Sequence, residues 1–192
     1  MNDDIYTTPK AELDERPLDQ DAHYVVSISK LTILFYTTFA MYLVYWFYAH
    51  WQRHKIHRSA DIWPIPRAIF SVFFTHSLFR YIDEKAGDRS GQWPAQLLAT
   101  VLVVAMIAGA FVDSVFDFQV ETTLYVAALL LLMFLQIIPM ARAQAVANEN
   151  CNDSEGASNN RLTIYNWLWI VAGIVFWLFF LLGVFGSKFL NQ

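Results

Sequence analysis

Residues 122–140, TTLYVAALLLLMFLQIIPM, carry no charged side chain. A helix needs about 20 mostly apolar residues to cross the roughly 30 Å hydrocarbon core of a bilayer. Three further stretches meet this requirement, residues 31–49, 94–112 and 163–186. Backbone N–H and C=O groups must be paired internally in hydrocarbon, so each stretch is expected to be a helix. The sequence therefore predicts four membrane-spanning helices.

The composition of the whole chain agrees with a membrane location. Of its 192 residues, 56% are hydrophobic and 16% are charged, whereas a soluble domain carries about 25% charged residues. The mean hydropathy is +0.34. The single cysteine excludes a disulfide scaffold, and a net charge of −4 offers no basic surface for nucleic acid. We find no Walker loop, Rossmann glycine pattern or His-Glu-x-x-His motif, so we expect neither an enzyme nor a bound cofactor.

A shorter apolar segment, residues 67–82, is interrupted by Arg67, His76 and Arg80. It is short for a span, which predicts a cytoplasmic interfacial or re-entrant helix wedged partly against the bundle. The Trp63-Pro64-Ile65-Pro66 run before it predicts a stiff connector.

The predicted fold is thus an all-α membrane protein, a four-transmembrane-helix bundle with one additional interfacial or re-entrant helix. Around it we expect an acidic polar tail (1–30), a membrane domain (31–186) that includes a cytoplasmic loop (141–162), and a C-terminal tail (187–192).

The orientation of the chain is predicted from its basic residues, which favour the cytoplasmic side of short loops. Nine of the 13 Lys and Arg residues lie in the connections before the second and the fourth predicted spans. This count predicts that both connections are cytoplasmic and that both termini are periplasmic. No signal peptide is expected, because no basic region leads into a short apolar core.

Three histidines follow the first predicted span with spacings of four and three. His50, His54 and His57 would therefore lie on one helix face. Imidazoles at such positions can share a transition metal or face a haem edge, although Arg53 and Lys55 would repel a cation. The alternative is a pH-sensitive charged patch at the membrane surface.

Four further polar residues are candidate ion sites. Asp113, Asp117 and Glu121 are spaced four apart, so they could bind a hard cation or feed protons to a channel mouth. The alternative is an exposed acidic turn. Gln136 is the deepest amide of the predicted spans, and we expect it to hydrogen-bond to a neighbouring helix or to line a substrate path.

Several residues are candidate contacts with lipid or with a partner. Trp46 and Trp51 belong to an aromatic belt at the end of the first span, where such rings prefer the headgroup level. His76 and Arg80 share a face of the short helix. Trp177 belongs to an aromatic last span that is large enough to dock another membrane protein.

One part of the chain resembles uncharacterised small bacterial multi-pass inner-membrane proteins. The resemblance is carried by the aromatic run Tyr42–Tyr48, by Trp51, and by residues 67–70 and 78–82. In these proteins, an aromatic-ended first helix precedes a basic segment and a Pro/Arg/Phe-rich juxtamembrane helix. The resemblance implies a bacterial inner membrane and brings no activity.

We therefore expect a non-enzymatic accessory or scaffold protein that acts on membrane lipids, on another membrane protein or on itself. The alternatives are a small oligomeric transporter or channel, and metal or haem binding by the histidines.

Overall fold

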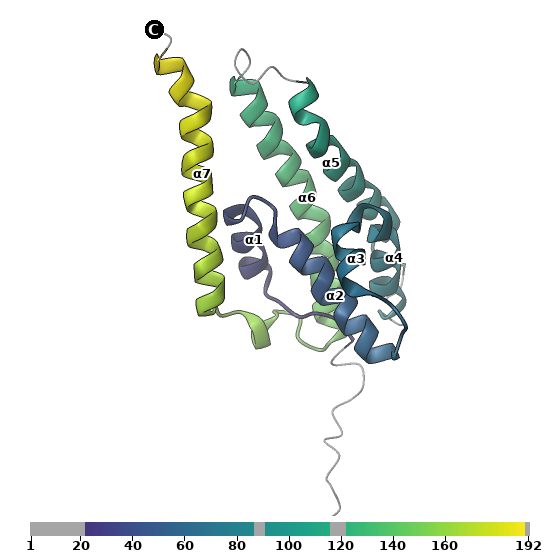
Figure 1. The fold of residues 1–192 in the computed structure, drawn as a ribbon. Coiled ribbons are helices and arrows are strands. Elements are labelled where there is room, and N and C mark those ends of the chain that lie inside the picture. The colour runs from purple at the N-terminus through teal and green to yellow at the C-terminus, as the bar shows by residue number, and fades with distance from the viewer. Residues whose placement is uncertain (1–21, 87–90, 116–121, 191–192) are drawn as a thin grey trace, which may run out of the picture.

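The computed structural model of the chain describes residues 22–86, 91–115 and 122–190, and their long elements are all helices (Figure 1). In chain order these are α1 (Ile28–Thr37), α2 (Tyr42–Arg58), α3 (Pro64–Ile69), α4 (Ser71–Glu84), α5 (Ala95–Val115), α6 (Thr122–Asn150) and α7 (Ile164–Leu190), with a short 3-10 turn, η3 (Ala157–Asn159), before α7.

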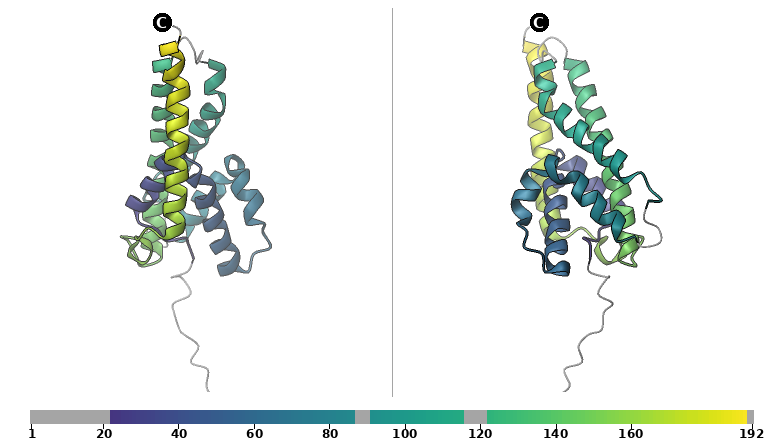
Figure 2. Two further views of the ribbon diagram at one scale, coloured as in Figure 1. Left: turned by 60° about the vertical axis from the view of Figure 1, so that its left-hand side comes forward. Right: turned by 90° about the vertical axis from the view of Figure 1, so that its right-hand side faces the viewer.

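Three of these helices, α5, α6 and α7, are long and apolar enough to cross a membrane. They correspond to the predicted spans 94–112, 122–140 and 163–186, and they make the chain an all-helical membrane protein. α5 and α6 pack on each other, whereas α7 stands to their left in Figure 1; Figure 2 shows the same helices from two other sides. The helix α6 continues through Pro139 to Asn150, so the predicted loop 141–162 is wrong in its first ten residues.

The predicted first span, 31–49, is not one helix. The chain rises as α1, turns at Thr38–Met41 and returns as α2, so both helices occupy only the lower half of the molecule (Figure 1). Ten residues make α1 about 15 Å long, roughly half of the hydrocarbon thickness. The prediction of a continuous helix is therefore wrong here, and the four-span bundle is not confirmed. We call α1, the turn and α2 the hairpin.

The turn of the hairpin is closed by hydrogen bonds at the end of α1. Thr38 Oγ1 donates to the Leu34 carbonyl at 2.6 Å and accepts from the Tyr42 amide at 3.0 Å. From α7, Trp177 Nε1 donates to the Tyr36 carbonyl at 2.9 Å. These bonds satisfy backbone groups that a helix end leaves without partners, which is a requirement at membrane depth.

The tip of the hairpin packs on α7. The Phe39 ring lies 4.6 Å from Trp177 and 5.3 Å from both Phe176 and Phe180, measured between ring centroids. Gly173 faces the Thr37 backbone so closely that an added Cβ would collide with it. These contacts position a turn in which Phe39 and Ala40 adopt positive φ angles of 55° and 63°.

The segment 67–82 is also two helices, not one. Pro64 begins α3, at a position where its missing N–H costs nothing, and the chain turns at Phe70 into α4. The Pro-rich run therefore forms the first turn of a helix. The prediction of a stiff connector at this position is wrong. α3 packs on α2, and α4 packs on α2, α5 and α6, so this segment is wedged against the bundle as expected.

The two ends of the described chain lie at opposite ends of the molecule. Ala22, the end of α2 and the start of α7 lie at the bottom of Figure 1, which we call the lower end, whereas α7 ends at the top. The termini themselves lie outside the described residues, so the prediction that both are periplasmic stays a prediction.

Candidate functional site

Gln144 of α6 is the centre of a buried polar network at the lower end. Its Oε1 accepts hydrogen bonds from Trp46 Nε1 at 2.6 Å and from His50 Nε2 at 3.2 Å. Its Nε2 donates to the Tyr24 carbonyl at 2.8 Å and to Asn148 Oδ1 at 2.7 Å. The amide thus makes four hydrogen bonds, which joins α2, α6 and the segment before α1.

Asn148, one turn further along α6, holds the same segment. Its Nδ2 donates to the Val26 carbonyl at 2.9 Å, and its Oδ1 accepts from the Val26 amide at 3.3 Å. Both Gln144 and Asn148 are completely buried. Together the two side chains provide hydrogen-bond partners for the backbone of the extended segment 22–27, which lies in no helix or sheet.

The three candidate histidines lie along α2 but have different surroundings. His50 is fully buried against Gln144 and the Trp46 ring, 4.5 Å away. His54 contacts the Tyr81 ring of α4 edge-on at 4.0 Å between ring centroids. Within the described residues, no group of three or more His, Cys, Asp or Glu is arranged to hold a metal ion. Metal or haem binding by His50, His54 and His57 has no geometric support and stays a prediction.

His23 is a buried histidine that sequence reasoning missed. Its ring lies 4.9 Å from that of Tyr81 and 6.2 Å from that of His50. Burial lowers the pKa of His23 well below its usual value, and the positive charges that His50, Lys85, His57 and His54 can carry lower it further. The imidazole is therefore neutral in the folded protein.

Trp46 and Trp51 lie in the protein interior. The prediction that they contact lipid or a partner at the membrane surface is therefore wrong. Both rings are buried, and the Arg67 guanidinium lies over the Trp51 ring at 4.6 Å. The reason is that α2 returns into the molecule and is covered by α3, α4 and α6, so its aromatic side chains fill the core.

His76 and Arg80 are exposed on α4, and their contact with lipid or a partner stays a prediction. His76 Nε2 lies 3.1 Å from Thr100 Oγ1 of α5. Arg80 pairs with Glu84 at 3.8 Å. An exposed pair of this kind contributes little to stability, and neither residue approaches the network around Gln144.

Gln136 is buried between α5 and α6, where its Nε2 donates to the Ala105 carbonyl at 3.5 Å. The expected hydrogen bond to a neighbouring helix is therefore present, although it is long. Asp117 and Glu121 lie outside the described residues, and the side chain of Asp113 is likewise not described. The predicted acidic ion site stays a prediction.

α7 has the least buried surface of the three long helices. Only 6% of its candidate span, Ile164–Gly183, is buried inside the protein, against 28% of the span in α5 and 33% of the span in α6. Its contacts with the hairpin use Gly173, Phe176, Trp177 and Phe180. On the opposite side, at helical spacing, lies an exposed apolar stripe that we call the outer stripe: Val171, Val175, Leu178 and Leu182.

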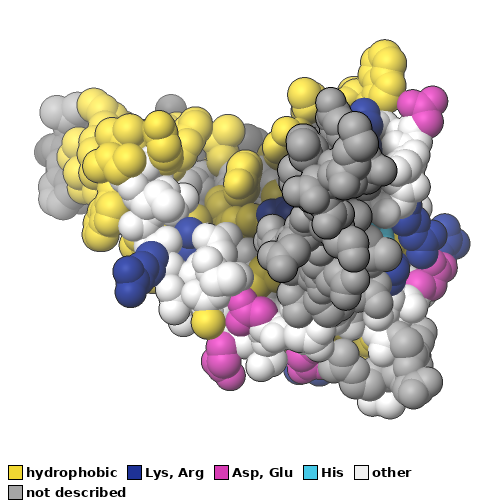
Figure 3. Space-filling model, turned by 90° about the horizontal axis from the view of Figure 1, so that it is seen from below, with side chains coloured by type: hydrophobic (Ala, Val, Ile, Leu, Met, Phe, Trp, Pro, Cys, Tyr) yellow, Lys and Arg dark blue, Asp and Glu magenta, His cyan; other side chains and the backbone are white. Residues whose placement is uncertain are grey.

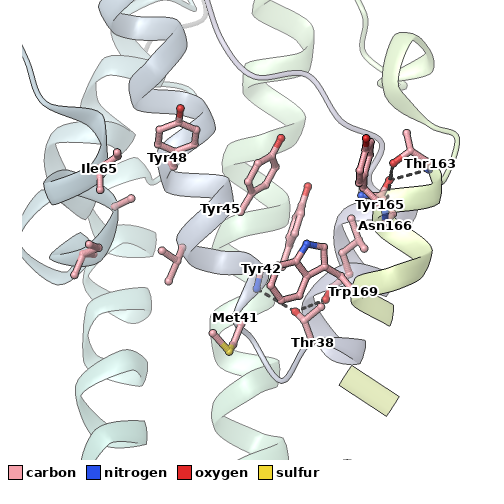
Figure 4. A pocket seen from close by; sticks show the side chains of 14 residues that line it. Thr38, Met41, Tyr42, Tyr45, Tyr48, Ile65, Thr163, Tyr165, Asn166 and Trp169 are labelled. Carbon is pink, nitrogen blue, oxygen red and sulfur yellow. Dashed lines mark hydrogen bonds between the residues drawn. The ribbon is translucent and has the colours of Figure 1, made fainter. Parts of the chain in front are cut away.

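A groove of about 570 Å³ lies between the hairpin, α3 and the start of α7. Figure 4 shows Tyr42, Tyr45 and Tyr48 of α2 facing it, with Tyr165 and Trp169 of α7 on the other side. The tyrosine hydroxyls point away from the turn of the hairpin, upward in Figure 4, which is toward the lower end as defined in Figure 1. The opposite end of the groove, at Thr38 and Met41, is formed by the turn of the hairpin. We call this space the tyrosine groove.

Charged side chains of both signs lie at the lower end. Seen from below, hydrophobic side chains cover the left-hand lobe, Lys and Arg lie beside this lobe and on the right-hand side, and Asp and Glu lie among them (Figure 3). Lys30 is buried near the start of α1, where its Nζ donates to Asn159 Oδ1 at 2.7 Å and to the Arg161 carbonyl at 2.8 Å. Arg161 is exposed two residues before Thr163 of the tyrosine groove.

The fold and these sites are those of a helical membrane protein with three helices long enough to span and a shorter hairpin beside them. Comparison of the chain with protein-family models, with curated proteins and with solved structures found no match.

The Gln144–Asn148 pair and the tyrosine groove were not predicted. Two amides four residues apart, directly after an uncharged helix, are a signal for a buried network, because they share one face. Tyr42, Tyr45 and Tyr48 are likewise spaced at three residues. Neither pattern indicates its partner, since the partners lie on segments far away in the sequence.

Proposed function

We propose that this protein is a non-enzymatic accessory or scaffold protein of a bacterial inner membrane, which docks on another membrane protein through α7. The observation that carries the proposal is the low burial of α7, only 6% of its candidate span. A spanning helix in a compact bundle packs along several neighbours, whereas α7 contacts the hairpin along one side.

The outer stripe is the surface that supports docking. Val171, Val175, Leu178 and Leu182 are between 45% and 66% exposed, and their branched side chains form a continuous apolar ridge. Helices in membranes associate by van der Waals packing of such ridges into complementary grooves. A second copy of the chain could serve as the partner, because its outer stripe is the same apolar ridge.

The orientation that we propose places the lower end in the cytoplasm. Arg53, Lys55 and Arg58 lie at the end of α2, and Arg142 and Arg161 lie near the end of α6 and before α7, all at that end. Basic residues in short loops favour the cytoplasmic side. With three spans, this orientation puts Ala22 in the cytoplasm and the end of α7 outside, and it makes the hairpin re-entrant from the cytoplasmic side.

Cysteine crosslinking in native membranes tests the docking surface. In a Cys151→Ala background, Val175→Cys carrying a maleimide–diazirine crosslinker, whose photoreactive end needs no thiol on the partner, is expected to give a discrete adduct, which mass spectrometry identifies as a partner or a second copy. The matched control is Val104→Cys, an exposed valine of α5. Equal yields from both positions, or no adduct from either, would overturn the proposal.

The alternatives from the sequence keep their own tests. Flux in liposomes that disappears in Asp113→Asn would favour the transporter or channel. Bound metal or a haem absorbance band in the purified protein would favour the histidine site.

A further inference from the structure

We propose that the tyrosine groove binds one acyl chain of an anionic membrane phospholipid, with the headgroup held between α2 and the start of α7. The volume of about 570 Å³ lies within the roughly 300–1,000 Å³ range of small-molecule sites. The proposal is independent of docking through the outer stripe, because the groove and the outer stripe use different residues.

The groove is open at the side that faces the surrounding bilayer. Met41, Ile65 and Trp169 line it and are 67%, 62% and 63% exposed. These side chains come from the hairpin, α3 and α7, so together they form a concave apolar wall. A convex lipid-facing helix surface only touches a mobile chain, whereas a concave wall of three elements surrounds one.

The polarity of the groove changes along its length as a phospholipid does. Near the turn of the hairpin it is lined by Leu34, Met41 and Thr38, and the Thr38 hydroxyl is already hydrogen-bonded to the Leu34 carbonyl. At the other end lie the hydroxyls of Tyr45 and Tyr48 and the Asn166 side chain (Figure 4). An acyl chain fits the first end, and ester and glycerol oxygens fit the hydrogen-bonding groups of the second.

Positive charge lies just beyond the polar end. None of the 14 lining residues is charged, but the Arg53 charge is close enough to act on the Tyr45 hydroxyl. Arg161, exposed, precedes Thr163 of the groove by two residues. Positive charge near Tyr45 and shortly before Thr163 favours a phosphate-containing anionic headgroup at the polar end of the groove.

The test uses the full-length protein in vesicles of phosphatidylglycerol and phosphatidylcholine, in which one lipid at a time carries an acyl-chain diazirine. After photolysis, mass spectrometry maps the labelled residues. We expect Met41 and Trp169 to be labelled more strongly than Leu131, an exposed residue of α6. We also expect labelling by phosphatidylglycerol to exceed that by phosphatidylcholine.

Two pairs of variants separate occupation of the groove from general lipid contact. Val44→Trp fills the groove and should lower the labelling of Trp169 to the level of Leu131, whereas Val104→Trp on α5 should not. Arg161→Gln should reduce the preference for phosphatidylglycerol about fivefold, whereas Arg142→Gln should leave it unchanged. Ile69→Trp is a second groove-filling variant, and circular dichroism with size exclusion verifies that each variant is folded.

Each part of the proposal has a result that overturns it. Equal labelling of Trp169 and Leu131, or full labelling in folded Val44→Trp and Ile69→Trp, would show that no lipid is held in the groove. Equal labelling by the two lipids, unchanged in Arg161→Gln, would overturn the anionic headgroup.

Discussion

Replacing Trp177 by Phe removes the indole N–H that α7 contributes to the end of α1, while most of the ring contact remains. In the folded protein this N–H donates to the Tyr36 carbonyl at 2.9 Å. The same carbonyl also accepts from the Phe39 amide, but only at 3.4 Å. Trp177→Phe therefore leaves the partly buried Tyr36 carbonyl with one long hydrogen bond.

The expected cost follows from this geometry. A buried backbone carbonyl that loses its partner costs about 1–3 kcal/mol. Because the Phe39 amide still provides part of the interaction, we expect the lower part of that range, about 1–2 kcal/mol. The Phe ring can keep its contact with Phe39, so packing contributes little to the difference.

Unfolding of the purified protein by SDS in mild detergent micelles, followed by circular dichroism, measures this change. The control is Trp167→Phe, the same exchange at a residue of α7 that is 52% exposed, for which we expect a change below about 0.5 kcal/mol. If Trp177→Phe is no less stable than Trp167→Phe, the bond to Tyr36 does not hold the hairpin.

Three further changes test the interior. Gly173→Ala drives a methyl group into the α1 backbone and should destabilise the protein by about 1–3 kcal/mol in the same titration, whereas Gly183→Ala, which meets open space, should be neutral or gain up to ~1 kcal/mol. Gln144→Leu removes four hydrogen bonds at once and should cost roughly 2–5 kcal/mol, compared with about 0.6 kcal/mol for Gln136→Leu; equal losses would contradict the role of the network. Because the pKa of His23 is lowered in the folded state, its contribution to stability is present above about pH 6.5 and is lost as the pH falls below it. A pH series of unfolding titrations should show this decrease in the native protein, and His23→Gln should flatten it.

Hydropathy was sufficient to predict the three long helices, because length and lack of charge are local properties. It could not distinguish a span from a hairpin in residues 31–49. The turn contains neither Gly nor Pro, and Phe39 and Ala40 adopt positive φ angles that such residues rarely take. Contact with Phe176, Trp177 and Phe180 favours the turn, and these residues lie more than a hundred positions later.

The candidate site could be predicted only in part for the same reason. Gln136 was expected to bond across to a neighbouring helix, and it does. The indole of Trp46 was expected at the membrane surface, because aromatic residues at the end of a span usually lie there. Once α2 is a returning helix, the same indole lies inside and bonds to Gln144. The turn at Thr38–Met41 thus changes the environment of the side chains on α2, because it directs this helix back into the protein.

The short hairpin also has a consequence for how the protein is made. In the orientation proposed above, α1 and α2 leave the cytoplasmic end and return to it, so the segment before α1 is not translocated during biosynthesis. In this arrangement, translocation before the last helix is limited to the short connection between α5 and α6. In the orientation proposed above, a protease-accessibility reporter inserted near Ala22 would therefore stay on the side of synthesis, as would one near Ser59. Hydropathy alone predicts a span between the two residues and places Ala22 outside.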